Sequence, residues 1–582
     1  MPGIRASLDE NQWRPRDIFA AVLLFSATAG FVLWQNSRVA VLWDLGYLLD
    51  TSWRMALGQM PYRDFPLVHG PLTFVLQAAL MRLAGRHYLV PVAYAAIAGG
   101  AGTVLTWRIV LRVLRGAAVF ALAAWPVALL LAAPVTVLGI YSVYPHPIYD
   151  CDCALAILIS VLLLTSLATT GETPGSTRSL PVAAGAATVL PVFFKQNLGV
   201  PFLAAVGAGV LLLLVLEFLK ARSVARALRS QSAFVLAGMA SALFLGLATI
   251  AGTAGIDNYL HWTVQFAAQR RLPGLSLMLS VYREPSLAWM LPALGAGLVL
   301  CCTRLVERRW ARIAAICLIA APLAATLLFF LMQDDAEDRA DSFLALWPLL
   351  LLAGFFIALL ELRRGVTLSR LMPFFVLAAI HGAFLSQQLW GSTYAVWPLL
   401  MVLVAQTWAA LPARARPVVI ATAALLGAVF IICGGLYAAS LERLSYIQIP
   451  DAPAQHSSIP ALRGMADRGP YLANFDELVA FTAREIPRGD ALLLLPGEDS
   501  FYYATGRTPQ FPVTLFDPTT DPYSASELLA EARRRDVRWV IVKRVQQIKG
   551  DPTPERDQTM ELIARDYALY RRLGGYDIYR RR

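Results

Sequence analysis

The chain is organised around the stretch WDLGYLLDTSWRMALGQMPYRDFPLVHGPLTFVLQAALMRLAG, residues Trp43–Gly85, which follows the first strongly apolar segment. This stretch carries acidic, basic and histidine side chains between aromatic residues. Pro61, Pro66, Gly70 and Pro71 interrupt regular structure within it. A simple connection between two membrane helices needs no such concentration of polar groups. We therefore interpret the stretch as a surface loop that carries chemistry, and the remaining chain as its scaffold.

The composition is that of a membrane protein. Of the 582 residues, 57% are hydrophobic and 15% are charged. Apolar runs of about 20 residues recur along the chain, which is the length that spans a hydrocarbon layer of about 30 Å. The net charge of +11 would indicate nucleic-acid binding in a soluble protein. Here many arginines lie in short connections between apolar runs, where they set orientation, so nucleic acid is excluded as a partner.

The six cysteines indicate no disulfide framework. Cys151 and Cys153 are too close in sequence for an ordinary bridge. This pair either fills apolar space or binds a metal. The other four lie in or beside apolar runs: Cys301, Cys302, Cys317 and Cys433.

The N-terminal region predicts the orientation of the chain. Residues 1–17 are basic and precede the apolar run Ile18–Gln35, which has no small-residue cleavage site after it. We expect a retained signal anchor with a cytoplasmic N-terminus and a first outer loop at about residues 37–88. Within that loop, Pro71–Ala84 is apolar but short of the 17–25 residues that a crossing needs. We expect it to form an amphipathic helix in the membrane interface.

The sequence predicts an α-helical transmembrane domain over residues 18–438 with about 13 crossings, which places the C-terminus outside. The predicted crossings are Ile18–Gln35, Leu89–Trp107, Ala117–Gly139, Cys153–Thr170, Leu180–Phe194, Gly199–Leu219, Ala233–Gly252, Ser286–Thr303, Ile313–Met332, Phe343–Leu362, Leu371–Gln388, Thr393–Leu411 and Val418–Tyr437.

Residues 439–582 differ in kind from the preceding chain. Helix-like and strand-like segments alternate there, which predicts a small extracytoplasmic α/β domain. The expected elements are a helix over Asp476–Arg484, a strand over Ala491–Pro496, a helix over Glu527–Arg535, a strand over Val537–Lys543 and a last helix over Glu555–Leu573.

Asp44 is the candidate catalytic carboxylate. It lies just beyond the first crossing, and an ionised carboxylate there would deprotonate an acceptor hydroxyl within hydrogen-bond reach. A helix cap or a solvated charge is the alternative. Asp50 follows six residues later, and at about 100° per residue an unbroken helix would not put both carboxylates on one face.

The second candidate group is YSVYPHPIYDCD, residues Tyr141–Asp152. Asp150 and Asp152, with His146, would bind a divalent cation or position a sugar, because oxygen ligands suit Mg²⁺ or Mn²⁺. An ordinary proline-rich turn with an acidic cap on the next helix explains the pattern equally well.

Two further groups offer positive charge on the same side of the membrane. Lys195, in FFKQN, lies at an apolar outer edge and needs an anionic partner, for which a lipid phosphate is the obvious choice. Snorkelling of the ammonium to the headgroups is the alternative. The loop Asp257–Pro285 holds Arg270 and Arg271 among aromatic residues. Arginine suits phosphate and aromatic faces suit sugars, although interfacial belt residues look the same.

These features in this order resemble the GT-C superfamily of integral membrane glycosyltransferases. The shared features are the first loop WDLGYLL…RMALGQMPYRDFPLVHGPLT, an interfacial helix, the outer loop YPHPIYDCD, an outer-edge KQN, thirteen crossings and an outer α/β tail. The resemblance is closest to the bacterial branch related to protein O-mannosyltransferases and to the aminoarabinose transferase of lipid A. It covers nearly the whole chain in architecture, with its motifs concentrated in Asp44–Thr73.

The resemblance implies a polyprenyl-phosphate sugar donor, an acceptor that is a cell-envelope glycan, lipid or protein, and a bacterial inner membrane location. Asp44 would be the base, and His69 would help to form the lipid-phosphate site. A divalent metal at Asp150 and Asp152 is one expectation. The remaining residues predicted to contact substrate are Asp50, Arg63, Asp64, Tyr149, Asp150, Lys195, Gln196, Arg270 and Arg271.

Two other functions remain open. A flippase or transporter of lipid-linked saccharides typically shows internal repeats and ionisable groups near the membrane midplane. With the boundaries above, no Lys or Arg falls within a crossing and the charges cluster in outer loops, which favours surface chemistry. A non-catalytic assembly subunit would show no turnover at all.

Overall fold

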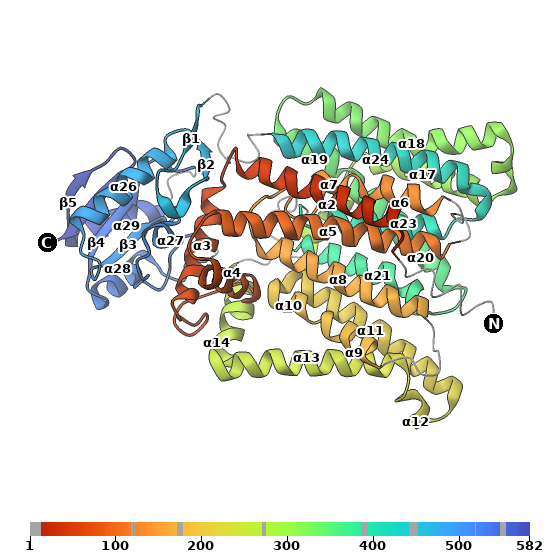
Figure 1. Cartoon of the computed structure of the whole chain (residues 1–582), viewed down its shortest axis with the longest axis horizontal. Coiled ribbons are helices and arrows are strands. Elements are labelled where there is room, and N and C mark those ends of the chain that lie inside the picture. The colour runs from red at the N-terminus through yellow and green to blue at the C-terminus, as the bar shows by residue number, and fades with distance from the viewer. Residues whose placement is uncertain are drawn as a thin grey trace.

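The protein is a long helical bundle with a small sheet-containing domain at one end (Figure 1). The computed structural model describes residues 13–117, 120, 123–170, 178–270, 275–385, 394–440, 452–517, 520–547 and 554–582. The C-terminus lies in the small domain, and the first described residues, which lead into the helix Pro15–Asn36, lie at the opposite end of the bundle. The predicted class, a polytopic α-helical membrane protein with a small C-terminal α/β domain, is confirmed.

Within the described residues, eight helical segments are long and apolar enough to cross a membrane. They are Pro15–Asn36 (α2), Leu89–Arg115 (α5), Tyr149–Ala168 of α8 (Tyr149–Thr170), Gln196–Ala221 (α11), Gln231–Thr253 (α13), Arg309–Met332 (α18), Asp338–Leu362 and Ala413–Ala439. The last two contain α19 (Ala336–Leu344), α20 (Leu346–Leu362) and α24 (Arg416–Ala439).

Shorter apolar helices account for the remaining predicted crossings. They are α6 and α7 (Ala124–Ala132, Val135–Leu138), α9 and α10 (Ser179–Ala187, Leu190–Phe194), α17 (Leu287–Cys302), α21 (Leu368–Ala383) and α23 (Trp397–Ala409). Each lies within or beside a predicted crossing, although parts of three of those crossings fall outside the described residues. The number thirteen itself stays a prediction, because several of these helices are shorter than a full crossing.

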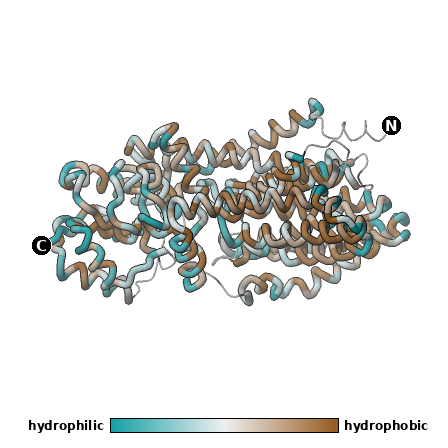
Figure 2. The backbone as a smooth tube through the Cα atoms, turned by 90° about the horizontal axis from the view of Figure 1, so that it is seen from below, coloured by the Kyte–Doolittle hydropathy of each residue, from teal (hydrophilic) through white to brown (hydrophobic). Residues whose placement is uncertain are grey.

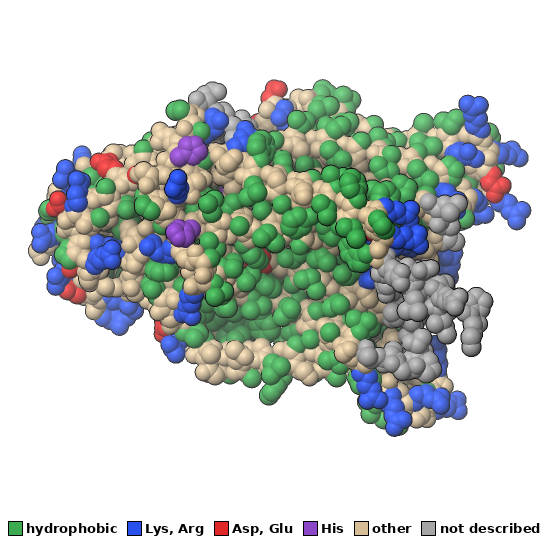
Figure 3. Space-filling model, in the orientation of Figure 1, with side chains coloured by type: hydrophobic (Ala, Val, Ile, Leu, Met, Phe, Trp, Pro, Cys, Tyr) green, Lys and Arg blue, Asp and Glu red, His purple; other side chains and the backbone are tan. Residues whose placement is uncertain are grey.

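The surface of the bundle is that of a lipid-facing protein. Hydrophobic side chains cover its flank, whereas Lys and Arg gather at the end far from the C-terminal domain and on that domain itself (Figure 3). Figure 2 shows the same contrast along the backbone, with the hydrophobic residues concentrated in the bundle. Phe244 and Leu245 on α13 are 71% and 63% exposed, a state that lipid rather than water would stabilise.

The first outer loop lies where the bundle meets the C-terminal domain (Figure 1). It forms α3 (Leu42–Ala56), a tight tip with a bridge between Pro61 and Phe65, and α4 (Leu72–Ala84). Helix α4 occupies the segment predicted as an interfacial helix, and it packs against α3. Since α3 is one unbroken helix, Asp44 and Asp50 point in different directions, as expected from their spacing.

The C-terminal domain contains a four-stranded sheet in the order β3-β4-β6-β5. Its elements are β1 (Ala454–His456), β2 (Ala466–Arg468), α26 (Tyr471–Glu485), β3 (Ala491–Leu495), α27 (Phe501–Thr505), α28 (Ala525–Arg534), β4 (Val537–Lys543), α29 (Pro554–Asp566), β5 (Tyr567–Arg572) and β6 (Tyr576–Arg581). Strands β3 and β4 are parallel and joined through α28, and the other pairs are antiparallel.

The prediction of a last helix reaching Leu573 is wrong. Helix α29 ends at Asp566, and the chain continues as β5, which pairs with β6 through a turn at Gly574 and Gly575. Tertiary pairing with the sheet therefore overrides the helical pattern of this segment.

Short helical segments complete the description. They are α12 (Val224–Ala227), α14 (Ile256–Leu260), the π-helix His261–Phe266, α15 (Ala267–Arg270) and α16 (Leu275–Met278), and the 3₁₀ turns Leu279–Arg283, Arg304–Glu307, Ala413–Ala415 and Pro460–Leu462.

Candidate active site

A buried ion pair joins Lys195 to Asp150. Helix α10 ends at Phe194, Lys195 adopts an extended conformation, and α11 begins at Gln196, so the lysine lies at a break between two helices. Asp150 lies in the first turn of α8. The two side chains are 11% and 3% exposed. The anionic partner that the sequence demanded for Lys195 is thus present within the protein itself.

Aromatic rings surround this pair. The Lys195 ammonium lies 5.0 Å from the centre of the Tyr149 ring. The His69 ring stacks on the same Tyr149 ring, with the two ring centres 3.8 Å apart. The Tyr394 hydroxyl donates to Asp150 Oδ2 over 3.3 Å. The structure therefore brings together three of the predicted groups: the first outer loop, the second outer loop and the helix break at Lys195.

Gly70 allows the first outer loop to reach the helix break. A Cβ at this position would lie 2.2 Å from the Phe193 carbonyl oxygen, so any other residue would push the loop away. Gly382 plays the same part for α21, since its Cβ would lie 2.2 Å from the Asn197 carbonyl oxygen. Beside them, the buried Nε2 of Gln196 has no hydrogen-bond partner among the described residues. The residue that follows Lys195 at the break thus carries a buried amide donor without a hydrogen-bond partner in the described part of the chain.

Asp44 is linked to this pair through two tyrosines. It lies in the first turn of α3, where the helix dipole favours a negative charge. Its Oδ2 accepts a hydrogen bond of 2.8 Å from the Tyr144 hydroxyl. The Tyr144 ring stacks on the Tyr394 ring, with centres 5.3 Å apart, and Tyr394 in turn contacts Asp150. Asp44 is partly exposed. A carboxylate and an ammonium therefore lie at the same end of the bundle, joined by an aromatic bridge.

The predicted metal pair does not fit a shared cation. Asp152 accepts hydrogen bonds from Thr73 (2.7 Å), Tyr94 (2.5 Å) and Tyr141 (2.6 Å), which occupy both of its oxygens. Asp150 faces Lys195 instead. No cluster of three or more His, Cys, Asp or Glu side chains suited to a metal occurs in the part of the chain that the structure describes. Asp152 therefore holds α4, α5 and α8 together, and we route no chemistry through a metal there.

The other charged residues of the first loop lie away from the lysine. Asp50 accepts hydrogen bonds from the backbone amides of Tyr502 (3.2 Å) and Tyr503 (2.7 Å) and so holds the C-terminal domain. Burial raises the pKa of Asp50 to about 8, although these two hydrogen bonds act to lower it. Arg63 and Asp64 form an exposed ion pair of 2.9 Å with each other at the loop tip.

Arg270 reaches the C-terminal domain, where its guanidinium donates to the Asp521 carbonyl oxygen over 2.9 Å. Burial raises the pKa of the Asp521 carboxyl to about 6. Arg271, the other predicted phosphate-binding arginine, lies outside the described residues.

Comparison with known proteins yields matches among solved structures alone. No family model and no curated protein matches the chain. ArnT from Cupriavidus metallidurans bound to undecaprenyl phosphate is similar at 14% identity and a TM-score of 0.41, over 96% of this chain and 97% of that one.

The oligosaccharyltransferase of Archaeoglobus fulgidus, in complex with Zn and sulfate, is similar at 13% identity and a TM-score of 0.49. The match covers 90% of this chain and 67% of that one. A second structure, the same enzyme AglB with an inhibitory peptide and a dolichol-phosphate, matches at 12% identity and a TM-score of 0.48, over 91% of this chain and 69% of that one. All of these TM-scores are below 0.5, and the candidate site rests on its own contacts.

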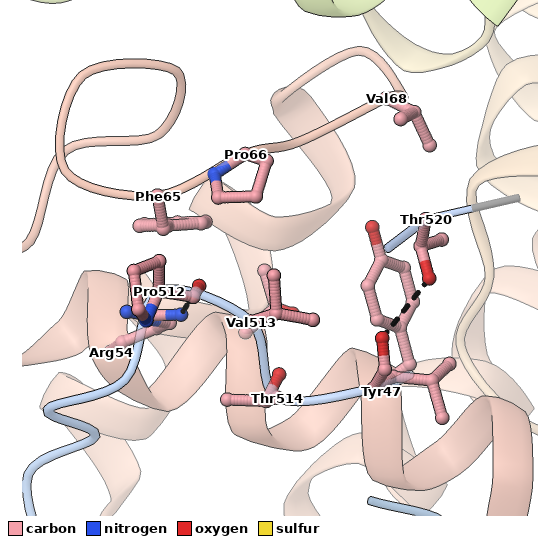
Figure 4. A pocket seen from close by; sticks show the side chains of 11 residues that line it. Tyr47, Arg54, Phe65, Pro66, Val68, Pro512, Val513, Thr514 and Thr520 are labelled. Atoms are coloured by element: carbon pink, nitrogen blue, oxygen red, sulfur yellow. Dashed lines mark hydrogen bonds between the residues drawn. The ribbon is translucent and has the colours of Figure 1, made fainter. Parts of the chain in front are cut away.

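A small pocket marks the seam between the first loop and the C-terminal domain. Figure 4 shows Tyr47 and Arg54 of α3 facing Pro512, Val513 and Thr514. Each nitrogen of the Arg54 guanidinium donates one hydrogen bond: Nε to Gln59 Oε1 (2.7 Å), Nη1 to the Pro512 carbonyl oxygen (2.5 Å) and Nη2 to the Phe511 carbonyl oxygen (3.2 Å). The seam is therefore a docking contact that these hydrogen bonds hold.

Sequence reasoning missed the tyrosines that connect the site. Tyr144 lies within the candidate segment Tyr141–Asp152, and its place beside the acidic residues is the one feature of the sequence that points to it. Tyr394 lies three residues before α23 and 244 residues from its partner Asp150, and nothing local in the sequence marks it.

Proposed function

We propose that the protein is a membrane glycosyltransferase that moves a sugar from a polyprenyl-phosphate donor to a glycan, lipid or protein acceptor outside the cytoplasm. The observation that carries the proposal is the pairing of a partly exposed carboxylate, Asp44, with a buried ammonium, Lys195, through Tyr144 and Tyr394. Group transfer from a phosphate needs both a base for the acceptor and a cation for the leaving group.

Lys195 would hold the donor phosphate. Its ammonium pairs with the Asp150 carboxylate and faces the Tyr149 ring. A phosphate beside it would share the ammonium with Asp150, and the Gln196 amide would donate a further hydrogen bond. As the sugar leaves, negative charge grows on the phosphate oxygen, and the fixed ammonium stabilises that charge. A contribution of Arg270 or Arg271 stays a prediction.

Asp44 would act as the base. Its carboxylate takes the proton from the acceptor hydroxyl while the hydroxyl oxygen attacks the anomeric carbon from the face opposite the phosphate. The bond between that carbon and the phosphate oxygen breaks, and the lipid phosphate leaves with the electron pair. The anomeric centre is therefore inverted. The hydrogen bond from Tyr144 orients the carboxylate for this step.

A small pocket with an almost entirely hydrophobic lining lies beside Tyr394, whose hydroxyl contacts Asp150. Its free space is too small for a whole polyprenyl chain, so the donor lipid would have to widen it or lie outside it. The lining residues are Leu138, Val143, Ala340, Phe343, Leu344, Tyr394, Trp397 and Tyr437.

The direct test uses purified protein in proteoliposomes with a panel of radiolabelled polyprenyl-phosphate sugars and cell-envelope acceptor fractions. Label that leaves the lipid and appears on an acceptor supports the proposal. Label that crosses the bilayer still attached to its lipid would instead establish a flippase. No change of the lipid in any combination would favour the non-catalytic subunit. The same proteoliposomes, treated with protease from outside, test the proposed extracytoplasmic side of the C-terminal domain.

A further inference from the structure

Helix α3 has no cap of its own. Its N-cap residue is Val41, whose side chain cannot accept a hydrogen bond, yet the first amide groups of a helix need acceptors. Two side chains from distant parts of the chain supply them. Val41 N donates to His146 Nε2 over 3.0 Å, and Leu42 N donates to Gln547 Oε1 over 2.8 Å. The turn that carries Asp44 is thus capped by the second outer loop and by the C-terminal domain.

Gln547 is held in one orientation. Its side chain is fully buried, and its Nε2 donates to the Ala40 carbonyl oxygen and to Asp467 Oδ2, both over 2.8 Å. Its backbone amide donates to Glu498 Oε1 over 2.6 Å. A flipped amide would place its NH₂ group against the Leu42 amide and lose every one of these side-chain contacts, so the network sets the orientation.

The segment that supports Gln547 also touches α3 directly. Glu498 and Asp499 form ion pairs with the buried Lys543 at 2.9 and 2.7 Å. A Cβ at Gly46 would lie 2.5 Å from the Glu498 carbonyl oxygen, so α3 packs backbone to backbone against this segment. The C-terminal domain therefore presents Gln547 to α3 from a rigid base.

We propose that Gln547 is a positioning residue for Asp44. It fixes the amide of Leu42, two residues before Asp44, and thereby the direction in which the first turn points the carboxylate toward Tyr144. The expected effect on kinetics rests on the proposed function. The expected effect on the structure of the first turn rests on the capping geometry alone. It gives the C-terminal domain a part in catalysis that needs no contact with substrate.

The test compares Gln547→Met with Gln59→Met in the full-length protein. Gln59 also bridges the first loop to the C-terminal domain, through a 2.9 Å hydrogen bond to the Pro509 carbonyl oxygen, but it lies far along the loop from Asp44. Hydrogen exchange of peptides covering residues 41–45 reports the cap independently of activity. We expect about tenfold faster exchange there in Gln547→Met and no change in Gln59→Met.

Transfer kinetics provide the second readout. Gln547→Met should lower kcat about tenfold while the donor KM stays within about twofold, because the donor phosphate site is untouched. Gln547→Glu, which still accepts from Leu42 but cannot donate to Ala40 when ionised, should fall between wild type and Gln547→Met in both readouts. Unchanged exchange at residues 41–45, or equal kinetic losses in Gln547→Met and Gln59→Met, would overturn the proposal. If the wild type transfers no sugar, the proposed function fails, and the exchange result alone still decides the cap.

Discussion

Two lysines in the described part of the chain, Lys195 and Lys543, are largely buried beside carboxylates, and their surroundings differ. Lys543 pairs with both Glu498 and Asp499, and Tyr576 donates to Asp499 over 2.6 Å. Burial by itself lowers the pKa of Lys543, but the two carboxylates outweigh burial and raise it. Lys195 pairs with Asp150 and lies at a break between two helices.

The comparison separates a structural cluster from a site. Lys543 lies in the interior of a domain, where surplus negative charge holds the cation and supports the residues that cap α3. Lys195 forms an ion pair with Asp150, and its ammonium faces the Tyr149 ring. A phosphate beside it would share the ammonium with Asp150, as proposed above. We therefore expect substitutions at the two lysines to affect different properties.

The largest effect is expected for Lys543→Met. This change leaves two buried carboxylates without a cation, which costs about 3–5 kcal/mol in comparable sites. We expect a large loss of folded protein in detergent, measured by size-exclusion chromatography and thermal unfolding. The control is Arg538→Met, which removes an exposed arginine that pairs with Asp490 and Asp536 and should change stability by less than about 1 kcal/mol. Equal stability of the two variants would remove the structural role of the Lys543 cluster.

At Lys195 the comparison predicts that a substitution lowers turnover without lowering the stability of the fold. Lys195→Met alone would leave the Asp150 carboxylate without its cation, so the informative variant combines Lys195→Met with Asp150→Asn and removes both charges. We expect this double variant to fold like the wild type but to transfer sugar about 100-fold more slowly, a loss of about 2.7 kcal/mol in transition-state stabilisation. A double variant with normal turnover would show that the pair is structural, like the Lys543 cluster.

A smaller effect concerns pH and the docking of the C-terminal domain. Burial raises the pKa of both Asp50 and Asp467 to about 8. Between about pH 4 and pH 8 the folded protein therefore holds protons that the unfolded chain has released, so stability falls as pH rises through this window. Two charged groups also act on the Asp50 carboxyl: Asp499 raises its pKa and Arg54 lowers it.

We expect the apparent unfolding temperature to decrease from pH 5 to pH 8, and to decrease less steeply in Asp50→Asn. Asp467 still titrates in that variant, so part of the slope should remain. The measurement is thermal unfolding at a series of pH values in one detergent. Identical slopes in the two proteins would mean that Asp50 is ionised throughout the range.

Much of the fold was predictable because lipid imposes a simple rule on sequence. Apolar runs of crossing length mark the bundle, and the segment Pro71–Ala84 forms a separate short helix, Leu72–Ala84, as the sequence predicts. The strand β5 was not predictable, because Tyr567–Arg572 becomes a strand only through pairing with β6.

The site was predictable in its parts and not in its connections. Asp44, Asp150 and Lys195 are charged residues at the ends of apolar runs, and such residues can be recognised in a single sequence. Their links run through Tyr144 and Tyr394, and the cap on α3 comes from a residue 505 positions away from Leu42. Contacts over such separations leave no local pattern. Likewise, Asp150 and Asp152 are two residues apart in the first turn of α8. Asp150 pairs with Lys195, whereas Asp152 accepts hydrogen bonds from three hydroxyl groups, and their spacing does not indicate this difference.

The central claim is that Asp44 is the base of a sugar transfer, and kcat of Asp44→Asn tests it most directly. The assay is transfer from the radiolabelled polyprenyl-phosphate sugar that the wild type uses, in proteoliposomes, with binding of the lipid donor measured in parallel. Asp338→Asn, a change at an exposed carboxylate outside the site, is the control. Our account predicts that Asp44→Asn binds donor normally and loses at least about 100-fold in kcat, whereas Asp338→Asn behaves as wild type. Turnover of Asp44→Asn equal to that of the wild type would contradict the account.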